Sequence, residues 1–548
     1  MLGVLFFSYM FDWKLVQPTY FEWLLRLDPA TQFIGWHFFR HEPWHLPLGA
    51  ALDYGIEMAS SIVYTDSIPL FAIAFKTLDE VLPDKFQYIG LWILFCYVLQ
   101  GLAAWLLSGL YTREMLQRTL MTAFFVISPI MLDRAIGHYA LMAHWLILFA
   151  LYLYLKPDDG QDTLAWAVLV SVSALVQAYL LYMVLAVWAA YIVRRTIVDN
   201  EMNAWVATRS ATIVWASLLS TMWLAGYFTI PVGAFAGGAS YYGTFAANLN
   251  ALWNPGWAAN FLPALPVRNQ NVEGYDYLGA GVLAMLALVM AILLVRHRAR
   301  VGLRSLLPLI CVAAILWLMA LSNQIAWGDK LVLTVPLPER LLGMLSMVRA
   351  SGRLLWVAYY GLTLLAVAVA VRHLPRQAGT LFLIAGLSVQ IADLSIRYVN
   401  EKEYFREHFI VEPAHWTSPL RSPFWSAAAK HYRDIRFVPV TETPKDYAVF
   451  ALFAADHRMR INVGYFARIA VQRVVAANDE LLRSLEYGDL RSDSLYIPWT
   501  PSTPLKYRLG SLDGIGTVDG FSVIAPRWFE FADCCGELRG ILKRGAER

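Results

Sequence analysis

Charged residues are scarce in this chain of 548 residues: 16% are charged, whereas 58% are hydrophobic. Soluble domains carry about 25% charged residues. The composition therefore excludes an ordinary globular protein and predicts a chain that crosses a membrane many times. The net charge of +3 also lacks the basic excess that is typical of nucleic-acid binding, so we expect no nucleic-acid partner.

Cysteine is almost absent. Cys96 and Cys311 lie in apolar runs, and the adjacent Cys534 and Cys535 lack the spacing of metal ligands, so neither a disulfide framework nor a zinc site is expected. The chain also lacks a P-loop, an HExxH motif, and a GxGxxG or GxSxG motif in a suitable context. These absences argue against nucleotide-driven chemistry, zinc hydrolysis and serine hydrolysis.

Long hydrophobic runs, by contrast, are abundant. Eleven reach or approach the length of about 20 residues that spans a bilayer: 1–16, 86–110, 116–131, 138–155, 163–177, 179–194, 208–230, 277–296, 303–322, 351–372 and 378–397. The stretch 163–194 could be one helix or two, and Gln177 and Tyr179 near its middle favour a break. The sequence thus predicts a polytopic α-helical membrane protein with about eleven transmembrane helices.

Arginine in the short loops predicts the orientation of these spans, because cytoplasmic loops are enriched in Lys and Arg. Four loops hold such residues: Arg113 and Arg118; Arg194, Arg195 and Arg209; Arg296, Arg298, Arg300 and Arg304; Arg372 and Arg376. With eleven spans and a cytoplasmic N-terminus, all four lie on the cytoplasmic side. The longer loops 13–85, 132–137, 231–276 and 323–350 then share the external side.

The composition changes after Arg397. Residues 398–548 are polar, with strand-like segments such as IRFVPV and SDSLYIPW and a helical segment, ARIAVQRVVAANDELLRSL. We expect two parts: a membrane domain over 1–397 that includes the large external loop 13–85, and a soluble α/β domain over 398–548. The topology places this second domain outside the membrane.

An aromatic and basic helix is expected at 28–41, where Trp36, His37 and Arg40 recur at helical spacing. Such side chains have an apolar and a polar end, which suits the lipid–water interface. They are also candidate contacts to a substrate or its phosphate. Further along the same loop, Asp53 and Glu57 are one helical turn apart, and we expect them on a solvated face.

Two carboxylates in this loop each have two interpretations. Asp28 precedes Pro29 and Asp66 lies three residues before Pro69, so each could cap a helix that starts at the proline. Alternatively, Asp28 is a general base at the mouth of a membrane cavity, and Asp66 orients it or binds a metal. A capping carboxylate is also rigidly placed, so the two interpretations are compatible.

Cationic and aromatic residues follow in the other external loops. Arg134 and His138 stand at a span entrance beside Asp133, and we interpret them as anion contacts. Arg349 and Arg353, four residues apart, could share one helical face and hold a phosphate, or could extend to lipid headgroups. The loop 231–276 holds a set of residues that suits a sugar or a packed loop: Asn254, Trp257, Glu273 and Asp276.

Four segments carry a resemblance to a known family: DPATQFIGWHFFRHEPWHLPLG, SIVYTDSIPL, FQYIGLW and GHYALMAHW. They resemble a bacterial family similar to GT-C membrane glycosyltransferases and catalogued mainly as a domain of unknown function. The long first loop with an early Asp, the many spans and the external C-terminal domain also resemble the GT-C class. The resemblance covers most of residues 13–397.

This resemblance implies a glycosyltransferase that uses a sugar carried on a polyprenyl phosphate or diphosphate in the bacterial inner membrane. The early Asp, here Asp28, would deprotonate or orient a glycan, lipid or protein acceptor, which attacks the anomeric carbon with inversion. Basic residues would hold the lipid phosphate, here Arg134, Arg349 and Arg353. Some members of the class use a divalent metal, Mg²⁺ or Mn²⁺, so Asp66 could be its ligand. The alternative is a transporter or flippase of a lipid-linked saccharide, although no repeated halves typical of transporters are evident.

Overall fold

The computed structural model describes residues 1–548 except 59, 158–161, 231–241, 258, 269–273, 296–302, 442, 500–505, 532–537 and 546–548. The chain divides into two compact units. The first unit comprises Met1–Gln17, Tyr88–Thr221 and Gly237–Val411. The second unit comprises Pro18–Gln87, Met222–Ala236 and Glu412–Arg548. Most of the predicted first loop therefore belongs to the same unit as the C-terminal region.

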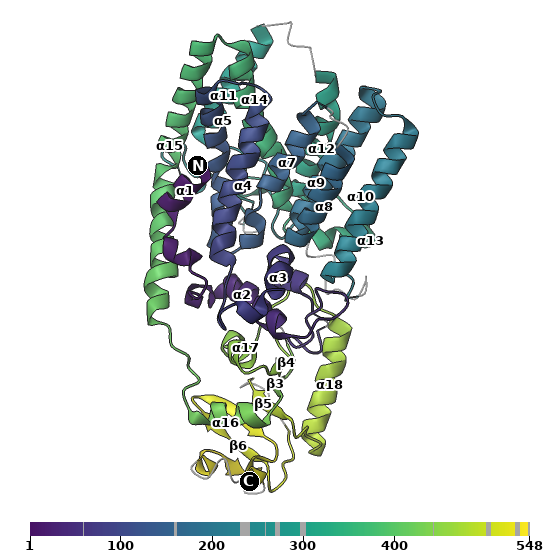
Figure 1. The fold of residues 1–548 in the computed structure, drawn as a ribbon, viewed down its shortest axis with the longest axis vertical. Coiled ribbons are helices and arrows are strands. Elements are labelled where there is room, and N and C mark those ends of the chain that lie inside the picture. Colours follow the sequence, from purple (N-terminus) through teal and green to yellow (C-terminus); the bar gives the residue numbers. More distant parts are fainter. Residues whose placement is uncertain are drawn as a thin grey trace. The chain divides into compact units, whose positions relative to one another are not determined.

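The first unit is a helical bundle, in which apolar helices such as α4, α5 and α7 lie against one another (Figure 1). Its helices are α1 (Leu2–Met10), α4 (Ile89–Gly109), α5 (Met115–Val126), α6 (Pro129–Asp133), α7 (Trp145–Leu155), α8 (Asp162–Val176), α9 (Ala178–Val193), α10 (Ala204–Ala225), α11 (Ala280–Val295), α12 (Leu303–Leu321), α13 (Glu339–Leu345), α14 (Trp356–His373) and α15 (Arg376–Arg406). An antiparallel hairpin follows α12, formed by β1 (Gln324–Trp327) and β2 (Lys330–Thr334). Large side chains such as Trp92 and Trp166 are fully buried in the bundle.

Six helical segments of the described chain are long and apolar enough to cross a membrane: Ile89–Gly109, Met115–Ile136, Ala178–Val198, Leu303–Leu321, Ser351–His373 and Arg376–His415. The chain is therefore a helical membrane protein. The run 163–194 is two helices, as Gln177 suggested, because its side chain accepts a hydrogen bond from the Tyr179 amide and caps α9. The expected helix over 1–16 is wrong: α1 ends at Met10, and Asp12 caps a separate 3₁₀ turn at Trp13–Val16.

The second unit combines the segment 18–87 with a six-stranded sheet. Its main helices are α2 (Leu27–His41), α3 (Pro69–Lys76), α16 (Pro423–His431), α17 (Tyr447–Asp456) and α18 (Val471–Tyr487). The strands, in spatial order, are β4 (Arg460–Ile461), β3 (Asp434–Val438), β5 (Ser494–Pro498), β7 (Phe521–Ala525), β6 (Gly514–Val518) and β8 (Lys543–Arg544). Strand β3 pairs in parallel with both β4 and β5, whereas β5–β7, β7–β6 and β6–β8 pair antiparallel. The strands and the long helix expected in this region are present as β3, β5 and α18.

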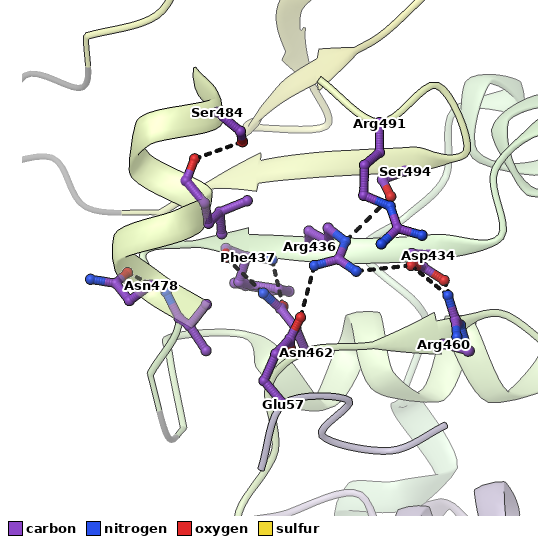
Figure 2. Close-up of polar contacts among 12 residues, drawn as sticks. Glu57, Asp434, Arg436, Phe437, Arg460, Asn462, Asn478, Ser484, Arg491 and Ser494 are labelled. Atoms are coloured by element: carbon purple, nitrogen blue, oxygen red, sulfur yellow. Dashed lines mark hydrogen bonds and ion pairs between the residues drawn. The ribbon is translucent and has the colours of Figure 1, made fainter. Parts of the chain in front are cut away.

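The segment around Glu57 docks onto this sheet, which corrects the expectation of a solvated face at Asp53 and Glu57. Tyr54 forms a parallel bridge with Ile461 of β4. Glu57 accepts a hydrogen bond of 2.8 Å from Arg436, whose guanidinium also binds Asp434 at 3.1 Å (Figure 2). The spacing of the two carboxylates in the sequence gave no sign of Arg436, which lies 379 residues away from Glu57.

Candidate functional site

A buried group of charged side chains lies in the helical bundle, and we call it the bundle cluster; it consists of Asp133, Arg134, Asp276, Arg397 and Glu401. Arg397 is 1% exposed and pairs through Nη2 with Asp133 at 2.8 Å and with Glu401 at 2.6 Å. Arg134 pairs with the other oxygen of Asp133. Burying ionised groups costs several kcal/mol each unless they are paired, so a cluster of this kind inside a membrane protein is a candidate functional site.

The end of α6 and the C-terminal part of α15 bring four of these residues together. Ser128 separates α5 from α6, and Pro129 starts α6, so Asp133 falls at the end of that short helix. Arg397 and Glu401 are one turn apart on α15, which continues to Arg406 instead of ending at the predicted domain boundary. Elsewhere on α15, the hydroxyl of Tyr398 donates a 2.7 Å hydrogen bond to the carbonyl of Ile127 and fixes the helix against the junction of α5 and α6.

Asp276 enters the cluster from the loop before α11. The next residue, Tyr277, donates a 2.7 Å hydrogen bond to Asp393 of α15, and the amide of Ala280 donates to the same carboxylate oxygen at 2.9 Å. These bonds fix the loop. Asp276 is 1% exposed and lies near the side chain of Trp356, but neither of its carboxylate oxygens makes a hydrogen bond of normal geometry within the described parts of the chain.

The surroundings of Asp276 favour its protonated form. Burial raises the pKa of its carboxyl group to about 8; the Arg134 guanidinium opposes that rise, the carboxylate of Asp133 adds to it, and the Trp356 side chain opposes it. A buried carboxyl group with a pKa near neutrality can donate or accept a hydrogen bond. At neutral pH the protonated form of Asp276 therefore predominates, and it can donate a hydrogen bond.

The bundle cluster offers both donors and acceptors to a ligand. The Nε and Nη1 atoms of Arg134, like the oxygens of Asp276, have no hydrogen-bond partner among the described residues. Aromatic rings adjoin the cluster: Arg397 lies 4.2 Å from the ring centre of Tyr275 and 5.6 Å from that of Trp257. A guanidinium, a carboxyl group and aromatic rings suit a ligand that carries hydroxyl groups and an anion.

A second charged group, around Asp434 in the second unit, has a different character. Asp434 is fully buried and accepts two hydrogen bonds from Arg460, at 2.7 and 2.8 Å, besides the bond from Arg436 (Figure 2). Hydrogen bonds from Arg436 and Arg460 thus already occupy both carboxylate oxygens of Asp434. This group therefore anchors the segment around Glu57 to the sheet and leaves Asp434 little capacity for a ligand.

Among the predicted anion contacts, Arg134 belongs to the bundle cluster. His138 is held next to it, because its backbone amide donates a 2.9 Å hydrogen bond to the carbonyl of Arg134, and its side chain is half-buried. Arg397 and Glu401 were missed by the sequence argument. Their spacing of four residues could have indicated them, but Arg397 is the last residue of the final apolar run and Glu401 was assigned to the start of the soluble domain, so the pair was divided.

Arg349 and Arg353 lie in the bundle as well, but not on one helical face. The chain breaks at Ala350, whose amide donates to the Tyr179 hydroxyl at 2.9 Å instead of continuing a helix. The guanidinium of Arg349 lies 5.7 Å from the ring centre of Phe245, and that of Arg353 lies 5.0 Å from that of Tyr179. Arg353 is only 8% exposed, so it is not a headgroup anchor that extends into lipid.

Asp28 and Asp66 both lie in the second unit. Asp28 is in the first turn of α2 and not at its cap, because the helix starts at Leu27, before Pro29. An acidic residue there still interacts favourably with the helix dipole. Asp66 does not cap α3 either: it has a left-handed backbone with φ of 52°. Ile68 shares this conformation with φ of 53°, which is strained for a β-branched residue.

Trp36, His37 and Arg40 form the expected helix, but their side chains are buried by protein and are not at a lipid interface. Trp36 donates a 2.9 Å hydrogen bond to the Phe86 carbonyl, and Arg40 donates to Asp79 at 2.6 Å. His37 is 2.9 Å from Asp456 of α17. The amphipathic pattern could not distinguish a lipid surface from a protein partner far along the chain.

Two predictions remain untested in these residues. Glu273 lies outside the described residues. In the part of the chain that is described, no group of three or more His, Cys, Asp or Glu side chains is placed to hold a metal ion. The suggestion that Asp66 binds a metal stays a prediction, and we assign no chemical step to a metal.

The fold and the bundle cluster define a helical membrane protein with a buried polar site and a C-terminal region built on a small sheet. The chain belongs to the family described as domain of unknown function DUF6311, whose model matches residues 1–395; the model of the C-terminal domain of the same family matches residues 424–526. No curated protein and no solved structure matches the chain.

Proposed function

We propose that this protein is a glycosyltransferase that moves a sugar from a polyprenyl-phosphate or polyprenyl-diphosphate donor to an acceptor at the external face of the bacterial inner membrane. The observation that carries the proposal is the bundle cluster. Arg134 and Asp276 are buried, and the Nε and Nη1 atoms of Arg134 and both carboxylate oxygens of Asp276 make no hydrogen bond of normal geometry among the described residues. Aromatic rings adjoin the cluster in a membrane protein. A lipid-linked sugar phosphate supplies both the anion and the hydroxyl groups that Arg134 and Asp276 could bind.

The proposed roles are phosphate binding, sugar binding and removal of the acceptor proton. Arg134 binds the donor phosphate, and His138, Arg349 and Arg353 supply further polar and cationic groups in the same unit. Asp276 binds a sugar hydroxyl. The base that removes the proton from the acceptor hydroxyl is Asp28, as the resemblance to the GT-C class implies, and the acceptor oxygen forms a bond to the anomeric carbon. The bond from that carbon to the phosphate oxygen breaks, the phosphate leaves with the electron pair, and the configuration inverts.

The test is transfer by the purified full-length protein in nanodiscs, with a panel of polyprenyl-phosphate and polyprenyl-diphosphate sugars and with glycan, lipid and peptide acceptors. Asp28→Asn keeps the size of the side chain and removes its basicity. We expect it to bind donor normally and to transfer about 10²–10⁴-fold more slowly, the usual cost of losing a general base.

The matched control is Glu80→Gln, which removes an exposed carboxylate from the same segment of the chain. It should transfer at the wild-type rate. Sugar transfer by none of the donor and acceptor pairs would reject the proposal. Binding of donor with movement across the bilayer and no transfer would identify a flippase instead, and undiminished turnover by Asp28→Asn would remove Asp28 from the mechanism.

A further inference from the structure

Helix α2, which carries Asp28, is held by the C-terminal region at several points. Arg26, just before the helix, pairs with Glu412 at 2.6 Å. His37, near its other end, is 2.9 Å from Asp456, the last residue of α17. Asp456 also pairs with Lys85 at 3.1 Å. All these residues belong to the second unit, so α2 and α17 are fixed against each other within one compact body.

The first residue of α17, Tyr447, lies at the Asp28 end of this contact. Its hydroxyl is 3.4 Å from the hydroxyl of Thr31, and either atom can be the donor. Thr31 follows Asp28 by three residues, and residues with this spacing are neighbours on one helical face. If Thr31 donates to the phenol oxygen, the phenol proton is available for a further acceptor on that face.

The Asp28 carboxylate interacts electrostatically with the Tyr447 phenol. Burial raises the pKa of the Tyr447 phenol, the hydroxyl of Thr31 opposes the rise, and Tyr465 and, to a smaller extent, the Asp28 carboxylate add to it. Because the negative charge of Asp28 disfavours the phenolate of Tyr447, the phenol stays neutral. A neutral phenol can donate a hydrogen bond to the carboxylate. The packing of α2 against α17, the contact between the Thr31 and Tyr447 hydroxyls, and this electrostatic interaction all indicate that Tyr447 lies close to Asp28.

We propose that Tyr447 is a positioning residue for Asp28, through which the C-terminal domain takes a direct part in the reaction. Its hydroxyl orients the carboxylate and favours its ionised form, so that the carboxylate can accept the acceptor's proton. The sequence places these residues 419 positions apart, and only the fold of the second unit unites them. This inference rests on the proposed function, because it assigns the role of base to Asp28.

The experiment uses Tyr447→Phe in the full-length protein, which removes one hydroxyl. The matched control is Tyr432→Phe in the same region: its hydroxyl donates a 2.9 Å hydrogen bond to the Pro526 carbonyl. We expect Tyr447→Phe to lower kcat roughly ten- to a hundred-fold, the effect of one hydrogen bond to a charged group. The KM for donor should not change, and the acidic limb of the pH profile should move to higher pH.

A second measurement does not depend on activity. In a double-mutant cycle on Tm, Tyr447→Phe and Asp28→Asn should be non-additive, whereas Tyr432→Phe and Asp28→Asn should add. Additive effects for the first pair, or kinetics of Tyr447→Phe that match those of Tyr432→Phe, would overturn the inference. If the wild-type protein transfers no sugar, the proposed function fails and the inference fails with it. A non-additive Tm cycle would then show only that Tyr447 and Asp28 interact.

Discussion

At the scale of single residues, Asp276 gives the protein a specific dependence on pH. Its pKa is raised to about 8 in the folded state from an ordinary value of 3.8, chiefly by burial. Between these values the folded protein holds a proton that the unfolded chain has released. Stability therefore falls as pH rises through this range. Each pKa unit corresponds to about 1.4 kcal/mol, so the effect is large.

We expect the Tm of the purified protein to decrease between pH 5 and pH 9, and Asp276→Asn to flatten that slope, because an amide does not titrate. Thermal unfolding in detergent at a series of pH values measures both. Asp489→Asn, which replaces an exposed carboxylate, serves as the control and should keep the wild-type slope. Parallel slopes for wild type and Asp276→Asn would show that Asp276 is not the titrating group.

At the scale of elements, the packing of α4 depends on the absence of a side chain at Gly90. A Cβ at this position would lie 1.7 Å from the carbonyl oxygen of Leu15, in the 3₁₀ turn Trp13–Val16. Backbone atoms cannot move aside as the end of a flexible side chain can. At Gly101 of the same helix, the nearest atom to a Cβ would be 3.6 Å away, which is an ordinary contact.

Two alanine variants therefore form a matched pair. Gly90→Ala should lower stability by roughly 1–3 kcal/mol, the usual cost of overpacking, even though alanine favours a helix. Gly101→Ala should be neutral or stabilise by up to about 1 kcal/mol, because it gains helix propensity without a clash. Thermal unfolding of both variants in the same detergent makes the comparison, and equal effects would contradict the close approach of Leu15 to α4.

The sequence predicted individual helices and strands better than it predicted which distant segments contact each other. Hydrophobic runs and the break at Gln177 identified helices, and alternating patterns identified β3 and β5, because both signals are local. The bundle cluster was found only in part: Arg134 was named, but Arg397 was not, since its partner Asp133 lies 264 residues away. Glu57 and Trp36 were placed at a solvated face and a lipid interface for the same reason, as each is covered by distant segments.

At the scale of the whole molecule, the arginine pattern predicts which side of the membrane each loop occupies. Among the described residues, six helical segments meet the length and hydropathy of a span, so the number of crossings needs an independent measurement. The orientation can be measured without knowing that number. If the arginine-rich loops are cytoplasmic, the C-terminal region lies outside.

In a variant without the four native cysteines, we introduce Ala476→Cys on the exposed face of α18. An impermeant maleimide should label it in intact spheroplasts, because the reagent reaches only external thiols. The control, Met115→Cys, replaces a side chain that is 68% exposed beside the arginine-rich loop at Arg113. It should react only after lysis. The opposite pattern would place the C-terminal region, and with it Asp28 and Tyr447 of the same compact unit, in the cytoplasm, where the proposed transfer at the external face could not occur.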